Sequence, residues 1–219
     1  MLGRLIWQRI EAGLRVSCLF VCLMFLTQLV QAETCLENWA CWRVEQLDDR
    51  LEVWVKNKKP YVFSASLKLR TRHLRNDQGS QRRYEVSGVV PGNTDWLALT
   101  LYPTSTMARA YYQDIFYWVP GDANAQHNDE VRYLAPFAKG ERYPLVQGFG
   151  GGWSHSGASK YAVDFAMPIG TPVHAARGGV VVQTVSHHNR GGSDRRYAKY
   201  ANYVIVLHDD GTTGEYHHL

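Results

Sequence analysis

The stretch "GFGGGWSHSGASKYAVDFAMPIGTPVHAARGGVV", residues 148–181, decides how the C-terminal third of the chain is interpreted. It places His155 on a glycine-rich loop and Asp164 in the run "YAVDFAM", nine positions later. Glycine lets a loop turn sharply enough to carry a side chain back over the strand that follows. Two interpretations are open: a metal site shared by His155 and Asp164, or a surface histidine beside an ordinary strand aspartate.

The run "YAVDFAM" is expected to be a β-strand, in which successive side chains face opposite sides. Tyr161, Val163 and Phe165 should then face a core, while Asp164 faces the other side between two alanines. The small alanines leave room above the carboxylate for an ion or a substrate. Taken alone, a strand aspartate on a solvated face remains the better explanation.

The rest of this region alternates strand-like runs with turn residues. "VHAA" follows Pro172, Gly178-Gly179 is expected to be a tight reversal, and "VVVQTVS", "NYVIVLH" and "TTGEYHHL" are further strands. Residues 187–201, "HHNRGGSDRRYAKYA", form a long polar loop. These runs predict a continuous antiparallel β meander without a convincing helix, within an antiparallel β-sheet domain over residues 134–219.

Residues 33–133 show short alternating runs broken by turns, as in "LEVWVKN" at residues 51–57. This pattern predicts a small all-β domain, a sandwich or half-barrel, ahead of the C-terminal sheet. No catalytic constellation is evident there, because His73 and His127 are isolated in polar turns. The predicted fold class of the whole chain is therefore all-β.

Residues 1–32 have the pattern of a secretory signal peptide. Three arginines precede an apolar run over residues 16–30, and Ala32 suits the cleavage position. The alternative is a membrane anchor, but the run is shorter than the ~20 residues that a spanning helix needs. We expect a secreted or periplasmic protein without a stable membrane span after cleavage.

Export also decides how the remaining cysteines are interpreted. Cys35 and Cys41 stay in the mature chain, and an oxidising compartment favours a disulfide between them. A metal site on these cysteines is disfavoured because no second Cys or His pair lies nearby in the sequence.

Composition limits the possible partners. The formal net charge of +4 is too small to favour nucleic acid, which usually binds a clustered basic face. The 13 Tyr and 7 Trp suit either a β-rich core or a glycan-binding surface. The sequence does not specify the oligomeric state.

Together with "NYVIVLHDDGTTGEYHHL", residues 202–219, the opening stretch resembles the lysostaphin-like, or LytM-type, zinc endopeptidases. These secreted or periplasmic enzymes cut peptide cross-links of bacterial cell walls. The resemblance covers residues 143–219 and rests on several elements in the right order: His and Asp, then "PIGTPVHAARGGVV", then "NYV", then "EYHHL". It implies a Zn²⁺ cofactor and peptidoglycan peptide cross-links as the substrate.

The resemblance assigns roles position by position. His155 and Asp164 match the first two zinc ligands, although more residues separate them than the three found in some family members. His218 matches the histidine of the family's "Y-x-H-L", which is taken to be catalytic. Strand alternation agrees, since Tyr216 and His218 would share one face and His217 the other.

One part of the family pattern is missing. A final His-x-His should follow further along the chain and supply the third zinc ligand, but the sequence given stops at Leu219. The resemblance therefore implies a truncated chain that holds zinc weakly or not at all and is inactive or nearly so as given. The remaining histidines of this region are poor substitutes, and His208 is expected to be a surface residue beside a turn. They are His174, His187, His188 and His208.

Three functions follow as hypotheses. The first is a zinc metalloendopeptidase of peptidoglycan. The second is a non-catalytic module of the same fold that binds cell wall or activates another wall hydrolase. The third, based on aromatic content alone, is a glycan-binding β protein.

Overall fold

The computed structural model describes residues 33–219 except residues 106–110, 153 and 193. The signal peptide expected at residues 1–32 lies outside the described residues. The described chain is built from β-strands, with two short 3-10 helices, η1 (Gly157–Ser159) and η2 (Arg195–Tyr200). The all-β prediction is confirmed, and none of the described helices is long and apolar enough to cross a membrane.

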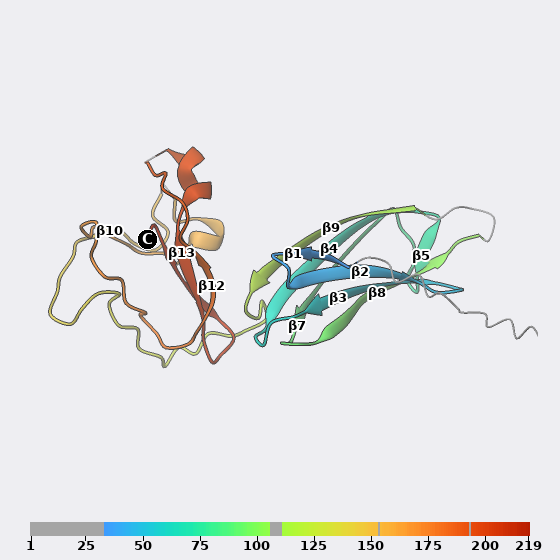
Figure 1. Ribbon diagram of the computed structural model, residues 1–219, viewed down its shortest axis with the longest axis horizontal. Coiled ribbons are helices and arrows are strands. Elements are labelled where there is room, and N and C mark those ends of the chain that lie inside the picture. The colour runs from blue at the N-terminus through green and yellow to red at the C-terminus, as the bar shows by residue number, and fades with distance from the viewer. Residues whose placement is uncertain (1–32, 106–110, 153, 193) are drawn as a thin grey trace, which may run out of the picture. The chain divides into compact units, whose positions relative to one another are not determined.

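Nine strands form two antiparallel sheets in the N-terminal part (Figure 1). The first sheet has the order β1-β2-β3-β8-β5-β6, with the bounds Thr34–Leu36, Ala40–Gln46, Leu51–Asn57, Asp95–Pro103, Leu74–Asn76 and Gly79–Ser80. The second has the order β7-β4-β9, with the bounds Arg83–Val90, Phe63–Arg72 and Tyr111–Pro120. One apolar core draws side chains from both sheets, so this part is a sandwich.

Alternation along β3 explains how the sandwich buries its core. Leu51, Val53 and Val55 are at most 6% exposed, while the residues between them are half-buried on the other face. β4 repeats the pattern with Leu67 and Leu69 inside and its lysine and arginines toward solvent. A two-residue period with β-branched and leucine side chains inward is what a half-buried strand requires.

The predicted disulfide is present between Cys35 and Cys41. The two residues are direct cross-strand partners in the β1–β2 pair, and their Cα atoms are 4.0 Å apart. The bridge therefore ties the first strand to the sandwich.

Five strands make up the C-terminal part, in two separate antiparallel sheets. β10 (Leu145–Gln147) pairs with β11 (Asp164–Phe165), and β12 (Val180–Val185), β13 (Tyr203–Leu207) and β14 (Thr213–His217) form a meander. The prediction of antiparallel strands is confirmed for these pairs. The prediction of one continuous meander is wrong, because β10–β11 and β12–β14 form two separate sheets.

The strand expected over "YAVDFAM" shrinks to β11. Tyr161 is 71% exposed and Val163 is 44% exposed, so the prediction that both face a core is wrong. Phe165 does pack, with its ring 5.4 Å from that of Phe137. Prolines on both sides of Ile169 remove backbone donors, which prevents the ladder from continuing past β11.

Two other expectations for this region are also wrong. "VHAA" is not a strand, since the N–H of His174 bonds to the carbonyl of Pro136 and no ladder forms. Gly178-Gly179 is not a reversal between strands, but leads into the start of β12. Gly179 is required there for close approach, because a Cβ atom would lie 2.2 Å from the carbonyl oxygen of Leu207 on β13.

Candidate metal centre

His155 and Asp164 come together in the structure. His155 lies on the loop between β10 and β11, where Gly150 and Gly157 have positive φ angles of 67° and 59°. The Nε2 atom of His155 is 3.2 Å from the Oδ1 atom of Asp164. The imidazole is 4% exposed and the carboxylate 47% exposed, so the pair has one buried and one open partner.

A hydrogen bond of the other ring nitrogen of His155, Nδ1, determines the protonation of the Nε2 atom that faces the carboxylate. Nδ1 lies 2.8 Å from the carbonyl oxygen of Gly148, and a carbonyl can only accept, so Nδ1–H donates. In the neutral imidazole, Nε2 then presents a lone pair to Asp164. Two acceptors at this distance repel unless a proton or a bound cation lies between them.

The donor set fits a zinc ion. Zinc bonds of about 2.0–2.1 Å to nitrogen and 2.0–2.2 Å to oxygen, at a tetrahedral angle, separate the two donors by about 3.3 Å. The observed separation of 3.2 Å matches that edge. Metal-bound histidines commonly donate their other N–H to a carbonyl or carboxylate, and Gly148 supplies such a carbonyl here.

The pair has no third protein ligand among the residues that the structure describes. In the described part of the chain, one cluster of three His, Cys, Asp or Glu side chains is close enough to share an ion: Glu33, Cys35 and Cys41. Both sulfurs of that cluster are in the disulfide, so it is not a metal site. A catalytic zinc usually has three protein ligands, and the described chain brings two together.

His218 lies at the end of the meander. β14 ends at His217 and His218 has a φ angle of 63°, so the expected strand alternation does not extend to it. The His218 side chain is exposed, and within the described chain it makes no hydrogen bond or ion pair with His155 or Asp164. His217 instead bonds to Glu215 at 3.0 Å, and this bond lowers the pKa of that carboxyl.

The expectation that His208 is a surface residue is wrong. Its side chain is 4% exposed, and Nδ1–H donates to the carbonyl of Gly178 at 2.8 Å. Its Nε2 atom is buried with no partner among the described groups and faces Gly214, where a Cβ atom would lie 2.9 Å away. His208 therefore ties the entry of β12 to the turn after β13, a role that no sequence pattern indicated.

An ion-pair network supports the same turn. Arg177 is 8% exposed and bonds to Asp210 at 2.7 Å and to Asp209 at 2.5 Å. Hydrogen bonds from Thr212 and from Arg177 hold the pKa of Asp210 well below its usual range. Bonds to Tyr133 and to the two aspartates raise the pKa of Arg177. No sequence pattern indicates this network, because Arg177 lies more than 30 residues from the two aspartates in the chain.

Comparison with known proteins supports the resemblance. Residues 158–219 match Peptidase family M23, and this segment contains Asp164 and His218 but begins after His155. Peptidoglycan DD-endopeptidase ShyA of Vibrio cholerae serotype O1 is 43% identical over 56 residues. That alignment covers 26% of this chain and 11% of the relative, so the chain spans about a tenth of the relative's length. No solved structure matches the chain.

Proposed function

We propose, on the premise that residues 158–219 belong to Peptidase family M23, that the protein is a zinc endopeptidase that hydrolyses peptide cross-links of peptidoglycan. The observation that carries the proposal is the pair of His155 and Asp164, held 3.2 Å apart with Nε2 toward the carboxylate. The relative named as a peptidoglycan DD-endopeptidase supports the same substrate.

His155, Asp164 and His218 have different roles in the proposed reaction. His155 and Asp164 would hold the ion, and the Gly148 carbonyl keeps the imidazole in the tautomer that leaves Nε2 free to bind. A zinc ion held there would supply Lewis-acid chemistry, activating water and polarising the scissile carbonyl. His218, exposed at the end of β14, serves to transfer protons at the reacting groups.

A second candidate function is a non-catalytic module that binds the cell wall or activates another wall hydrolase. The observation that favours it is the set of only two ligands brought together in the described part of the chain. Hydrolysis needs a third ligand beside His155 and Asp164, whereas wall binding does not.

We further propose that the protein acts outside the cytoplasm, secreted or in the periplasm. Residues 1–32 would be the signal peptide, residues 33–133 the N-terminal β domain and residues 134–219 the peptidase part. The Cys35–Cys41 disulfide supports an oxidising compartment.

The test measures the loss of cross-linked dimers from purified peptidoglycan, by chromatography of the released fragments. The protein is produced from its complete coding sequence and loaded with zinc. His155→Ala and Asp164→Ala should each lower the rate by about 100-fold or more, because each removes a ligand and even outer partners of metal sites contribute 10–100-fold. His174→Ala is the matched control, since that histidine is exposed and, among the described residues, its hydrogen bond is made by the backbone N–H.

Each outcome separates the two candidates. Hydrolysis that survives either ligand substitution would refute the zinc site. A zinc-loaded wild type that binds peptidoglycan but never cuts it would favour the non-catalytic module.

A further inference from the structure

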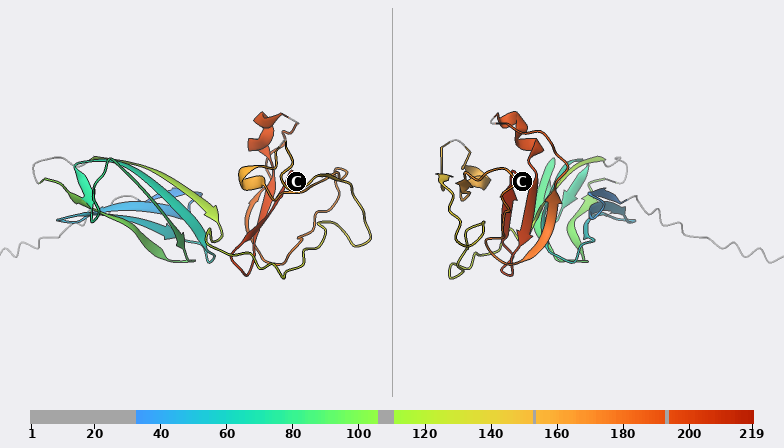
Figure 2. Two further views of the ribbon diagram at one scale, coloured as in Figure 1. Left: turned by 180° about the vertical axis from the view of Figure 1, so that it is seen from behind. Right: turned by 60° about the vertical axis from the view of Figure 1, so that its left-hand side comes forward.

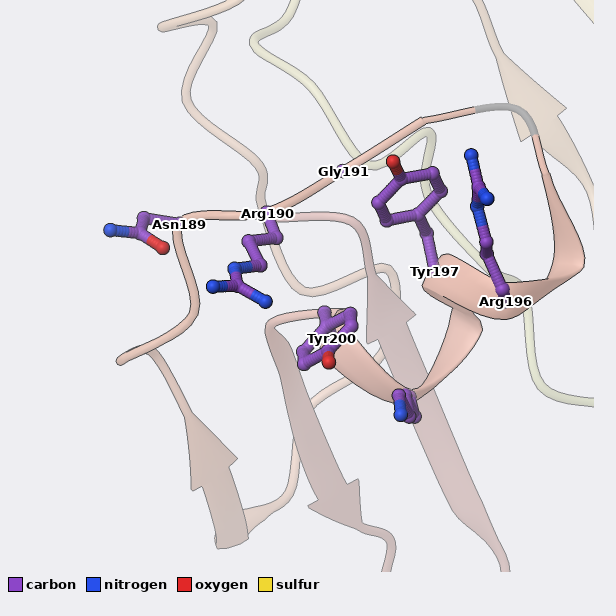
Figure 3. Close-up of a pocket in the computed structure, with 7 residues that line it drawn as sticks. Asn189, Arg190, Gly191, Arg196, Tyr197 and Tyr200 are labelled. Carbon is purple, nitrogen blue, oxygen red and sulfur yellow. The ribbon is translucent and has the colours of Figure 1, made fainter.

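The loop between β12 and β13 contains an open pocket of about 590 Å³ that the proposed zinc site does not use (Figure 3). Three cationic side chains and two tyrosines line it, and we call this set the basic pocket: Arg190, Arg196, Tyr197, Lys199 and Tyr200. No acidic side chain is among the described residues that line it. The pocket is therefore suited to an anionic ligand.

Aromatic rings hold the cations of the basic pocket. The guanidinium carbon of Arg190 and the ammonium of Lys199 lie 5.7 Å and 5.0 Å from the ring centre of Tyr200. The guanidinium of Arg196 lies 5.1 Å from the ring centre of Tyr197. A ring face orders a cation without cancelling its charge, so the charge remains available to a ligand.

The cations have few competing anions. In the part of the chain that the structure describes, no carboxylate lies within ion-pair distance of Arg190 or Lys199, and Arg196 has only Asp194 at 3.6 Å. Asp194 is itself committed to the start of η2, where it accepts the N–H of Arg196 at 2.8 Å. The local net charge thus stays positive.

The shape of the pocket is built in. A Cβ atom at Gly192 would lie 2.9 Å from ring carbons of Tyr197, so only glycine lets the loop close over that ring. The Asp194 cap fixes the start of η2, which carries four of the five residues that form the pocket. The ligand therefore meets an ordered set of charges.

Hydrogen bonds place the base of this loop beside His218. Asn202 donates from Nδ2 to the carbonyls of His188 and Leu219, each at 3.0 Å. Its own carbonyl accepts the N–H of Leu219 at 3.3 Å. The loop with η2 extends past the ends of β12 and β13 (Figure 2). The basic pocket thus lies on the loop whose base is tied to the residue that follows His218.

We infer that the basic pocket is a subsite for the free carboxylates of peptidoglycan peptide stems, an inference that rests on the proposed function. Guanidinium groups pair with carboxylates through two parallel hydrogen bonds, and tyrosine rings offer apolar contact to the peptide. A lipid surface fits less well, because η2, "RRYAKY", has no aliphatic side chain larger than alanine to insert among acyl chains.

The experiment measures binding rather than hydrolysis, so that it stands apart from the zinc proposal. Complete protein carrying Asp164→Ala is sedimented with purified peptidoglycan in the presence of a chelator. Adding Arg190→Ala and Lys199→Ala should weaken binding by about tenfold. The difference in affinity should shrink in high salt, because the ion pairs between these cations and the ligand carboxylates are exposed to solvent. Arg190→Lys with Lys199→Arg should retain binding, which separates lost charge from lost folding.

Arg75→Ala is the matched control. Arg75 is also an exposed cation stacked on a tyrosine, 5.4 Å from the ring centre of Tyr102 in the sandwich. The Arg75→Ala substitution should leave peptidoglycan binding unchanged if the basic pocket is the binding site. An equal loss with Arg75→Ala would overturn the assignment in favour of nonspecific charge attraction.

A second arm identifies the ligand. Peptidoglycan whose carboxylates have been amidated should bind wild type and the double Ala variant equally weakly. Binding of wild type that is undiminished by amidation would overturn the inference. So would a double Ala variant that loses affinity for phosphatidylglycerol vesicles or for inorganic phosphate while it still binds peptidoglycan normally. Failure of hydrolysis in the separate assay would leave this result standing.

Discussion

Replacing Gly179 by alanine should disrupt the pairing of β12 with β13. The new Cβ atom would lie 2.2 Å from the carbonyl oxygen of Leu207 and 2.7 Å from a methyl carbon of Val206. Ordinary contacts are more than 1 Å longer, and the carbonyl is fixed in the ladder, so the backbones must separate. Forced repacking of this kind costs about 2–3 kcal/mol. Gly178 is the matched control, because its Cβ would meet nothing within 4 Å.

Hydrogen exchange of the β12 and β13 amides measures this cost directly. Gly179→Ala should lower their protection by about 30- to 150-fold, which is the factor that about 2–3 kcal/mol produces. Gly178→Ala should leave protection unchanged or raise it slightly, since it restricts the unfolded chain. Equal protection in the two variants would refute the close approach of Gly179 to β13.

Two further predictions concern stability. Asp210 has a lowered pKa in the fold, so its contribution is present above its ordinary pKa of about 3.9 and is lost as the pH falls below it. Asp210→Asn should therefore be less stable than wild type at pH 7, and the gap should narrow in urea titrations toward pH 3; a constant gap would contradict the role of Arg177 as its partner. Replacing Cys35 and Cys41 by serine should lower the free energy of unfolding by about 2 kcal/mol in denaturant titrations, because the bridge closes a short loop. An unchanged midpoint would show that the bridge adds no stability.

Local patterns in the sequence predicted much of the fold. The alternation in "LEVWVKN" predicted the strand β3, and the cysteine spacing predicted the disulfide. The β12–β14 meander also follows from its apolar runs and turn residues. Each of these features is determined by residues that lie close together in the sequence, so it can be predicted without the structure.

Other parts depended on contacts between distant segments. Alternation in "YAVDFAM" predicted a buried Tyr161, but β11 pairs only with the short β10, and the Tyr161 side chain is left 71% exposed. His208 looked like a turn residue because the sequence does not show that Gly214 and the Gly178 carbonyl make a buried place for it. Burial is decided by what packs above a strand, and a strand's own period does not reveal it.

The candidate metal centre divides in the same way. Residue types and order singled out His155 and Asp164, and the structure places the two side chains in contact. The sequence could not predict the hydrogen bond from Nδ1 of His155 to the carbonyl of Gly148, because every residue has a backbone carbonyl and the residue types do not indicate which one accepts. Their role as zinc ligands, and that of His218 in catalysis, remain predictions.

The most direct test of the account observes the imidazole of His155 as zinc is added. Long-range ¹H–¹⁵N NMR separates the two ring nitrogens of each histidine. We expect saturating zinc to shift the Nε2 resonance of His155, while Nδ1 keeps its proton and still donates it to the carbonyl of Gly148. Asp164→Asn should weaken the dependence of that shift on the zinc concentration. Two results would contradict the proposed metal centre. One is a set of His155 resonances that does not respond to zinc, and the other is a zinc-induced shift of Nδ1 in place of Nε2.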